Sequence, residues 1–348
     1  MKIHFSVISA VYVLYIIEST SASTVSREKC ESENKECKPL SSCRQFIANL
    51  SELINILPYC DADNYIVCCP KETKETESKF TSSGHMEVFE KECSIFNDEN
   101  QKYCTLHPFI IDGTKATGKE FPHMALIGNK SNNGIDWQCG GALISRNYVL
   151  TAAHCYDEPK LELYVVRLGE LDYNVSTDDA SPQDFNVINF ITHYLYSEEG
   201  NDIGLIKLDR SVDFNSYIMP ACLPYDEKDQ YSELTAAGWG ATEFAGKKSS
   251  HLLKVYLKTL DSSNCDDSDQ DFNNSTEICV GSRNGKGDTC QGDSGSPIFI
   301  EHPKYKCMFM LIGITSHGIG CKGSGTYTKI HLYVKWIEYI VWNTTSPI

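Results

Sequence analysis

The chain has 348 residues, 41% of them hydrophobic, and a formal net charge of −16. This length suffices for one large domain with its own core and a second, small domain. The net negative charge excludes nucleic-acid binding through a basic surface. Its simplest explanation is that it keeps the protein soluble. Sixteen cysteines without metal-binding spacings exclude a reducing cytosol and indicate disulfide bonds.

The first residues read as a leader. Lys2 precedes a mainly apolar run from Ile3 to Ile17, and small residues follow at 19–23. The run is shorter than a bilayer-spanning helix requires, and no basic cluster follows it. We expect a signal peptide over residues 1–22 and a secreted, extracellular protein that is not anchored in a membrane.

Residues 30–69 form a cysteine-rich segment that is too short to bury a core unaided, so disulfides are its expected source of stability. We predict a separate stapled domain. A zinc module is the alternative, which the lack of histidine and the secretory context disfavour. Spacing alone does not choose among the roughly 15 pairings that six cysteines permit. The cysteines are Cys30, Cys37, Cys43, Cys60, Cys68 and Cys69.

Residues 70–109 read as a linker. The stretch 71–79 is charged and polar without apolar periodicity, so it has nothing to bury and should be mobile. Cys93 and Cys104 lie outside the preceding set and imply that the linker is tethered to a partner further along the chain.

Beyond the linker, short apolar segments bounded by Gly, Asn and Asp predict strands of an antiparallel, all-β fold. These segments include Tyr164–Leu168, Val187–Ile191, Leu205–Leu208 and Met308–Ile314.

Three motifs follow one another in the order His, Asp, Ser. His154 lies among small residues, Asp202 heads an apolar strand, and Ser294 lies in the glycine-rich stretch Gly287–Pro297. A serine hydroxyl is a poor nucleophile unless a histidine accepts its proton and an acid orients that histidine. Glycine at 292 lets its N–H face an oxyanion. If each motif is taken singly, the glycine-rich stretch could be an ordinary surface turn, and His154 could be a buried structural histidine.

From about Ile110 to the C-terminus the chain resembles the trypsin/chymotrypsin family of serine peptidases, whose signatures TAAHC, DIALL and GDSGGP these motifs match. The resemblance implies a peptidase domain over 110–348, built from two antiparallel six-stranded β-barrels and a packed C-terminal helix over His331 to Trp342. The chain departs from the signatures at Ser296 and Gly204, where the family usually has glycine and alanine.

The resemblance also implies the site. It makes His154, Asp202 and Ser294 the catalytic residues, and the N–H groups of Gly292 and Ser294 the oxyanion hole. Asp288 stands at the base of the specificity pocket, where a carboxylate selects Lys or Arg. The expected substrate-binding residues are Asp288, Thr289, Ser316, Gly318 and Gly325.

The cysteine-rich segment resembles the clip domain of arthropod serine peptidase zymogens, through its final adjacent pair and the wide gap before Cys60. This likeness implies the bridges Cys30–Cys68, Cys37–Cys60 and Cys43–Cys69. In the peptidase domain the family implies Cys139–Cys155, Cys265–Cys279 and Cys290–Cys321. Cys222 bonds either Cys104 or Cys93, and Cys307 is available for the other.

The stretch His107–Gly113 resembles the family's activation site. Cleavage after Phe109 frees the α-amino group of Ile110, which is mostly cationic near neutral pH and pairs with a buried carboxylate. Asp293 has the family's position for that partner, so the uncut chain is expected to be an inactive zymogen. Because the activation bond follows Phe109 and the pocket selects Lys or Arg, the enzyme should not activate itself. In this it resembles the snake and persephone subgroup.

Two lesser signals concern metals and glycans. Glu170, Asp172 and Asp179 lie in a loop that resembles the calcium loop of some relatives. A solvated acidic loop is the alternative, and no cofactor is needed for catalysis. Acceptors for N-glycosylation begin at Asn49, Asn129, Asn174, Asn273, Asn274 and Asn343.

We therefore expect a secreted clip-domain serine endopeptidase zymogen that cuts downstream protease zymogens after Arg or Lys. By resemblance, its cascade serves immunity (Toll signalling or melanization) or development in haemolymph. Its expected partners are an upstream activating protease and serpin inhibitors. The alternatives are a weak or inactive homologue that acts as a binding cofactor in melanization, and a digestive trypsin, which the clip segment disfavours.

Overall fold

The chain divides into two compact units, residues 1–85 with 343–348, and residues 86–342. No helix among the described residues is long and apolar enough to span a bilayer. The computed structural model describes residues 29–30, 35–39, 59–61, 66–70, 87–104, 114–132, 134–157, 160–197, 200–226, 228–241, 246–265, 272–282, 293–318 and 324–342.

The described part of the first unit is a three-stranded antiparallel sheet of β1 (Lys35–Pro39), β2 (Tyr59–Asp61) and β3 (Ile66–Pro70), in the order β1-β3-β2. Disulfides Cys30–Cys68 and Cys37–Cys60 cross it. Cys69 is also disulfide-bonded, and Cys43 lies outside the described residues. Because Cys30, Cys68 and Cys69 are buried, sulfur provides much of the interior of this small unit.

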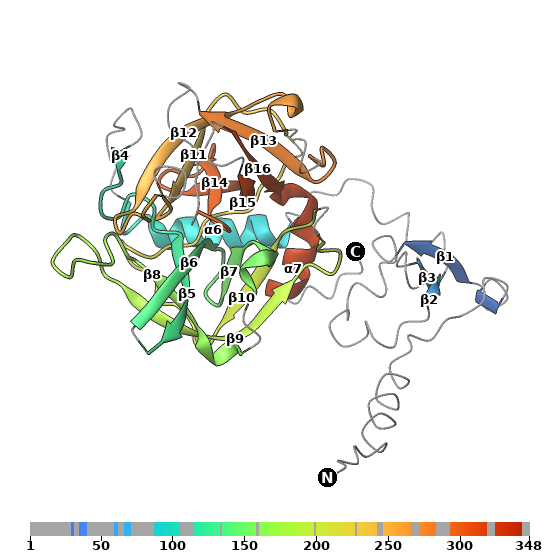
Figure 1. Ribbon diagram of the computed structural model, residues 1–348, viewed down its shortest axis with the longest axis horizontal. Helices are drawn as coiled ribbons and strands as arrows, with labels where there is room; N and C mark the ends of the chain where they lie inside the picture. The colour runs from blue at the N-terminus through green and yellow to red at the C-terminus, as the bar shows by residue number, and fades with distance from the viewer. Residues whose placement is uncertain are drawn as a thin grey trace, which may run out of the picture. The chain divides into compact units, whose positions relative to one another are not determined.

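The second unit contains two β-barrels (Figure 1). The first closes in the order β10-β7-β6-β5-β8-β9. Its strands alternate in burial where one face meets the core: in β9, Phe185 and Val187 are buried between exposed neighbours. Its strands are β5 (Met124–Ser131), β6 (Gly134–Leu143), β7 (Tyr148–Thr151), β8 (Tyr164–Leu168), β9 (Gln183–Thr192) and β10 (Gly204–Leu208).

The second barrel runs β11-β14-β15-β16-β13-β12 and closes through pairing of β11 with β12; the short β4 (Thr114–Lys115) adds to β12. Its strands are β11 (Leu234–Gly238), β12 (Leu253–Thr259), β13 (Glu277–Ser282), β14 (Pro297–Glu301), β15 (Phe309–Gly318) and β16 (Ser324–Lys329). This confirms the expected two six-stranded barrels. Single 3-10 turns are η2 (Ala153–Cys155), η3 (Leu161–Leu163), η4 (Ser262–Asn264) and η5 (Ile330–Tyr333).

The C-terminal helix α7 (Val334–Trp342) follows η5 and buries Val334, Trp336 and Ile337. The expectation of a packed helix at this end of the chain is confirmed.

The linker predicted over 70–109 contains a helix that the sequence analysis did not predict. Residues Val88–Asn100 form helix α6, which lies against the barrels and beside α7 (Figure 1). The physical reason is one apolar face: Phe89, Cys93 and Phe96 are buried at helical spacing, and Phe96 packs edge-on against Phe214 with ring centroids 5.7 Å apart. The stretch 71–79, on which the prediction depended, lies outside the described residues.

Two disulfides attach α6 and the residues just after it to the peptidase unit, one from the middle of the helix and one from beyond its C-terminal end. Cys93 bonds Cys222, which decides between the two expected partners, and Cys104 bonds Cys307. Asn100 adds a hydrogen bond from Nδ2 to the carbonyl oxygen of Cys307, at 2.9 Å. The helix therefore belongs to the peptidase unit although it precedes Phe109 in sequence.

Candidate active site

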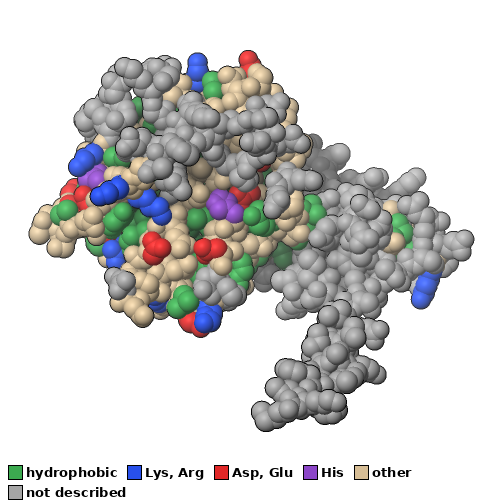
Figure 2. Space-filling view, in the orientation of Figure 1, with side chains coloured by type: hydrophobic (Ala, Val, Ile, Leu, Met, Phe, Trp, Pro, Cys, Tyr) green, Lys and Arg blue, Asp and Glu red, His purple; other side chains and the backbone are tan. Residues whose placement is uncertain are grey.

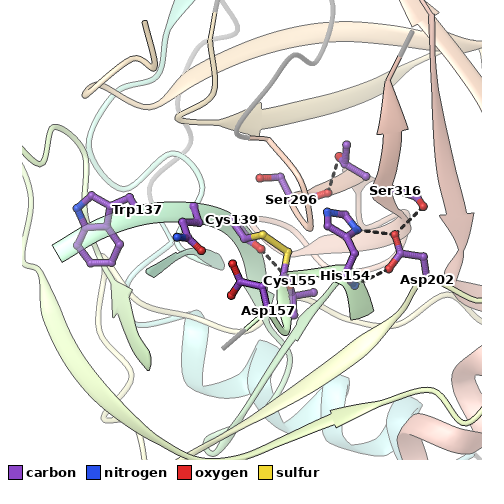
Figure 3. The surroundings of a disulfide bond; sticks show 12 residues. Trp137, Cys139, His154, Cys155, Asp157, Asp202, Ser296 and Ser316 are labelled. Atoms are coloured by element: carbon purple, nitrogen blue, oxygen red, sulfur yellow. Dashed lines mark hydrogen bonds and ion pairs between the residues drawn. A yellow bond between two sulfur atoms is a disulfide. The ribbon is translucent and has the colours of Figure 1, made fainter. Parts of the chain in front are cut away.

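Strand pairing brings His154 and Asp202 together. β7 and β10 are antiparallel, with Thr151 opposite Gly204, so the residues just after β7 and just before β10 lie beyond the same end of the pair. Nδ1 of His154 lies 2.6 Å from Oδ2 of Asp202, and the backbone N–H of His154 donates to Oδ1 at 2.9 Å. Two contacts fix both the position and the orientation of the imidazole (Figure 3).

Asp202 is buried at 1% exposure but remains hydrogen-bonded. The hydroxyl of Ser316 donates to Oδ2 at 2.6 Å, and Thr328 donates to the Asp202 carbonyl oxygen at 2.9 Å. Burial alone would raise the pKa of this carboxyl, but hydrogen bonds and the charge of His154, with the bond from Ser316, hold the pKa below its usual range. The acid is therefore a carboxylate that holds the Nδ1 proton of its histidine.

The His154 side chain is 30% exposed, so the ring edge opposite Asp202 is open to a reactant. Figure 2 shows that histidine and acidic side chains reach the surface on the face of the molecule seen in Figure 1.

Ser294 lies on a turn that is anchored on both barrels. Its carbonyl oxygen accepts the N–H of Gly140 on β6 at 2.8 Å, and the N–H of Gly295 donates to Thr315 on β15 at 2.9 Å. Gly295 has φ +76°, and a Cβ there would come within 2.2 Å of Oγ1 of Thr151. Because Thr151 lies three residues before His154, this contact places the serine turn beside the histidine segment.

Asp293, next to the serine, is buried against backbone. Its Oδ1 accepts the N–H of Gly240 at 2.9 Å. A Cβ on Gly238 would lie 2.0 Å from the same oxygen, so glycine is required for the carboxylate to fit. The expected partner Ile110 lies outside the described residues.

The substrate-binding residues are placed in part. Gly318 at the end of β15 pairs with Gly325 on β16. Ser316, expected in the pocket wall, directs its hydroxyl to Asp202 instead (Figure 3), a role that the sequence analysis did not assign to it. Phe109, Asp288, Thr289, Gly292 and the pair Cys290 and Cys321 lie outside the described residues.

Both departures from the family signatures fit the packing around them, Ser296 beside Gly140 and Gly204 beside the ring of Phe190. A Cβ on Gly140 would lie 2.0 Å from Oγ of Ser296, so this hydroxyl occupies space that only a glycine leaves. The Ser296 Oγ is buried and has no hydrogen-bond partner in the described part of the chain. At Gly204, a Cβ would press on the ring of Phe190 at 3.0 Å.

Disulfides Cys139–Cys155 and Cys265–Cys279 are also present, the first directly beside His154 (Figure 3). In the described residues, each group of three close metal-ligating side chains includes disulfide-bonded cysteines, whose sulfurs are not thiolates.

The acidic loop that resembles a calcium site has basic and polar neighbours. Glu170 contacts Arg167 at 3.2 Å and Asp179 contacts Lys119 at 3.3 Å, while Asp172 accepts the N–H of Asn174. Calcium binding stays a prediction. The side chains of Arg167 and Lys119 would compete with the ion for the carboxylates of Glu170 and Asp179.

The glycan acceptors differ in exposure. Asn174 and Asn274 are exposed, and Asn273 is half-buried. The half-buried Asn129 has its Nδ2 3.3 Å from Oε1 of Gln138. Occupancy stays a prediction, and Asn49 and Asn343 lie outside the described residues.

A sequence model of the trypsin family, described as Trypsin, matches residues 110–337. The chain is 38% identical over 252 residues to the serine protease snk of Drosophila melanogaster, an alignment that covers 67% of this chain and 57% of snk. It is 31% identical over 360 residues to phenoloxidase-activating factor 3 of Holotrichia diomphalia, covering 94% of this chain and 97% of that protein. It is also 31% identical over 380 residues to the CLIP domain-containing serine protease HP8 of Bombyx mori, covering 97% and 98%. The chain therefore belongs to the trypsin family and, within it, to the clip-domain serine proteases of arthropods.

Proposed function

We propose that the chain is a secreted zymogen that is cut after Phe109 and then cleaves downstream protease zymogens after Arg or Lys, in an extracellular immune or developmental cascade. The observation that carries the proposal is the pairing of His154 with a buried, ionised Asp202 next to a doubly anchored Ser294 turn. Relatives named as phenoloxidase-activating factor and proclotting enzyme support a place in such a cascade.

In this mechanism Ser294 Oγ attacks the carbonyl carbon of the scissile bond while Nε2 of His154 accepts its proton. The N–H groups of Gly292 and Ser294 stabilise the oxyanion. Nε2 then returns the proton to the leaving amine as the C–N bond breaks. Water, deprotonated by the same nitrogen, hydrolyses the acyl-serine.

Activation and specificity complete the proposal. The freed amine of Ile110 binds the Asp293 carboxylate, for which Gly238 and Gly240 leave room, and this fixes the turn that carries Gly292. Asp288 then accepts Arg or Lys. An upstream protease with an apolar pocket is needed for the Phe109 bond, and serpins are the expected inhibitors.

The test replaces residues 105–109 with an enteropeptidase site, so that the cut is made at will before Ile110. The cut chain should hydrolyse an Arg-ended chromogenic peptide and leave a Phe-ended one intact, whereas the uncut chain should be inactive. Ser294→Ala is the matched control and should lower kcat by about 10⁶-fold. Cleavage of Phe-ended but not Arg-ended peptide would refute the specificity.

A weak or inactive homologue is the second candidate, and the unpartnered Ser296 hydroxyl at the turn, which has no hydrogen-bond partner among the described residues, is the observation that favours it. It predicts that the cut chain and Ser294→Ala have the same background rate.

Incubating the unmodified zymogen with a trace of the cut enzyme tests self-activation: no new N-terminus at Ile110 is expected.

A further inference from the structure

The residue before Asp202 is held in an unusual backbone conformation. Asn201 has φ +58°, in the left-handed region that few residues other than glycine adopt. Both ends of its carboxamide are engaged: Oδ1 accepts the hydroxyl of Tyr333 at 2.9 Å, and Nδ2 donates to the carbonyl oxygen of Leu195 at 3.1 Å. The two side-chain hydrogen bonds thus offset the free-energy cost of a left-handed backbone at Asn201.

The residue after Asp202 is held by the same neighbourhood. The N–H of His193 donates to the carbonyl oxygen of Ile203 at 3.0 Å. The His193 ring packs edge-to-face on Tyr333 and Trp336, with centroids 4.9 Å and 5.1 Å apart. We call His193, Tyr333 and Trp336 the aromatic cluster; all three are buried.

The direct contacts of Asp202 need this support. His154 and Ser316 bond to its carboxylate at 2.6 Å, a distance that a small rotation of the backbone at 201 would lengthen. Charge-assisted hydrogen bonds weaken quickly with misalignment.

We propose that Tyr333 and Asn201 are positioning residues for Asp202: the Tyr333 hydroxyl fixes the left-handed turn at Asn201, and that turn aims the carboxylate at His154. The inference deepens the proposed function and rests on it. The interaction is a hydrogen bond between two side chains that lie outside the catalytic triad.

The same arrangement links the site to the segment before Phe109. Tyr333 immediately precedes α7, and Glu338 on α7 accepts the N–H of Phe89 on α6 at 3.0 Å. Since Cys93–Cys222 retains α6 after a cut at Phe109, α7 keeps this support in the cut enzyme.

The test compares Tyr333→Phe, Asn201→Gly and the double variant in the full chain with the enteropeptidase site. Tyr333→Phe removes one hydroxyl, and Asn201→Gly keeps the left-handed backbone but removes both side-chain bonds. Each should lower kcat roughly five- to tenfold with KM unchanged, the loss expected for one buried hydrogen bond. The double variant should lose no more than the worse single, because both single variants remove the hydrogen bond between Tyr333 and Asn201. Tyr148→Phe, buried on β7 away from the site, is the matched control and should keep wild-type kcat.

A second readout needs no turnover. The proton held between Nδ1 of His154 and Asp202 should give a low-field NMR signal in the chain, and this signal should broaden through faster exchange in Tyr333→Phe but not in Tyr148→Phe. Unchanged kcat and an unchanged signal in Tyr333→Phe would overturn the inference. If the wild-type cut chain hydrolyses no peptide, the proposed function has failed, and the signal in the uncut chain alone decides whether Tyr333 positions Asp202.

Discussion

The backbone N–H of Phe89, in the first turn of α6, donates a buried hydrogen bond of 3.0 Å to Oε1 of Glu338 on α7. Lys335 on α7 reaches the other oxygen of Glu338 at 3.3 Å and also pairs with Glu87. A helix that precedes the proposed cut is thereby fastened to the last helix of the fold.

We predict that Glu338→Ala destabilises the uncut chain by about 1–3 kcal/mol, because it leaves the N–H of Phe89 buried without an acceptor. Urea unfolding measures the change. The control is Glu87→Ala, which removes an exposed partner of Lys335 and should cost less than about 1 kcal/mol. Equal losses in the two variants would mean that the buried bond contributes little.

A second prediction concerns the two disulfides that span the Phe109 bond. Cys93–Cys222 and Cys104–Cys307 each join a residue before the bond to one after it. After the cut, non-reducing electrophoresis should show one species and reducing electrophoresis two. Replacing either cysteine pair by serine should leave one species, and only removal of both pairs should release the N-terminal piece. If replacing only one pair releases the N-terminal piece, the other bridge does not form.

A third prediction follows from His123. Its ring is buried among Phe121, Phe299 and Phe309, and neither nitrogen has a partner in the described structure. Burial lowers the pKa of His123 to about 3. The unfolded chain takes up a proton near the ordinary value of 6.5, whereas the folded chain does not, so stability is full above about pH 6.5 and falls as the pH drops towards 3.

The expected fall is at most about 1.4 kcal/mol per pH unit from this histidine. Melting temperatures at pH 7, 6, 5 and 4 measure it, and His123→Leu should flatten the curve. Because burial also lowers the pKa of His193 and of His302 to about 4, a residual slope remains in that variant. His251→Gln, which changes a half-buried ring, is the control. A slope unaffected by His123→Leu would contradict the argument.

A fourth prediction uses the contact between Gly140 and Ser296. Gly140→Ala should destabilise the chain by about 1–3 kcal/mol through overpacking, because its Cβ would lie 2.0 Å from the serine oxygen. Adding Ser296→Gly should recover most of that loss. Ser296→Ala alone should raise stability by about 1 kcal/mol, since it removes a buried hydroxyl that has no partner among the described residues. Thermal unfolding of the four chains tests this, and a double variant that recovers none of the loss caused by Gly140→Ala would disprove the contact.

The sequence was sufficient where the signal is local. The segments 164–168 and 205–208 are strands, because their apolar residues are contiguous and bounded by polar residues. His154 and Asp202 were identified by their neighbours along the chain, and the structure brings these two side chains together.

Contacts between distant residues were not predictable in this way. α6 was missed because charged residues separate Phe89 from Cys93, and because Phe214, the packing partner of Phe96, lies far along the chain. The choice between Cys93 and Cys104 depended on that helix, which contains Cys93 and ends before Cys104. Asn201 and Tyr333 are 132 residues apart, so no local pattern signals their hydrogen bond.

The fit of Ser296 against Gly140 also constrains the order in which mutations can accumulate. A lineage that carries serine at 296 is committed to glycine at 140, since any larger residue would meet the hydroxyl first. Before position 140 can vary, the hydroxyl at position 296 must be lost. Among descendants of this sequence, the two positions should therefore covary.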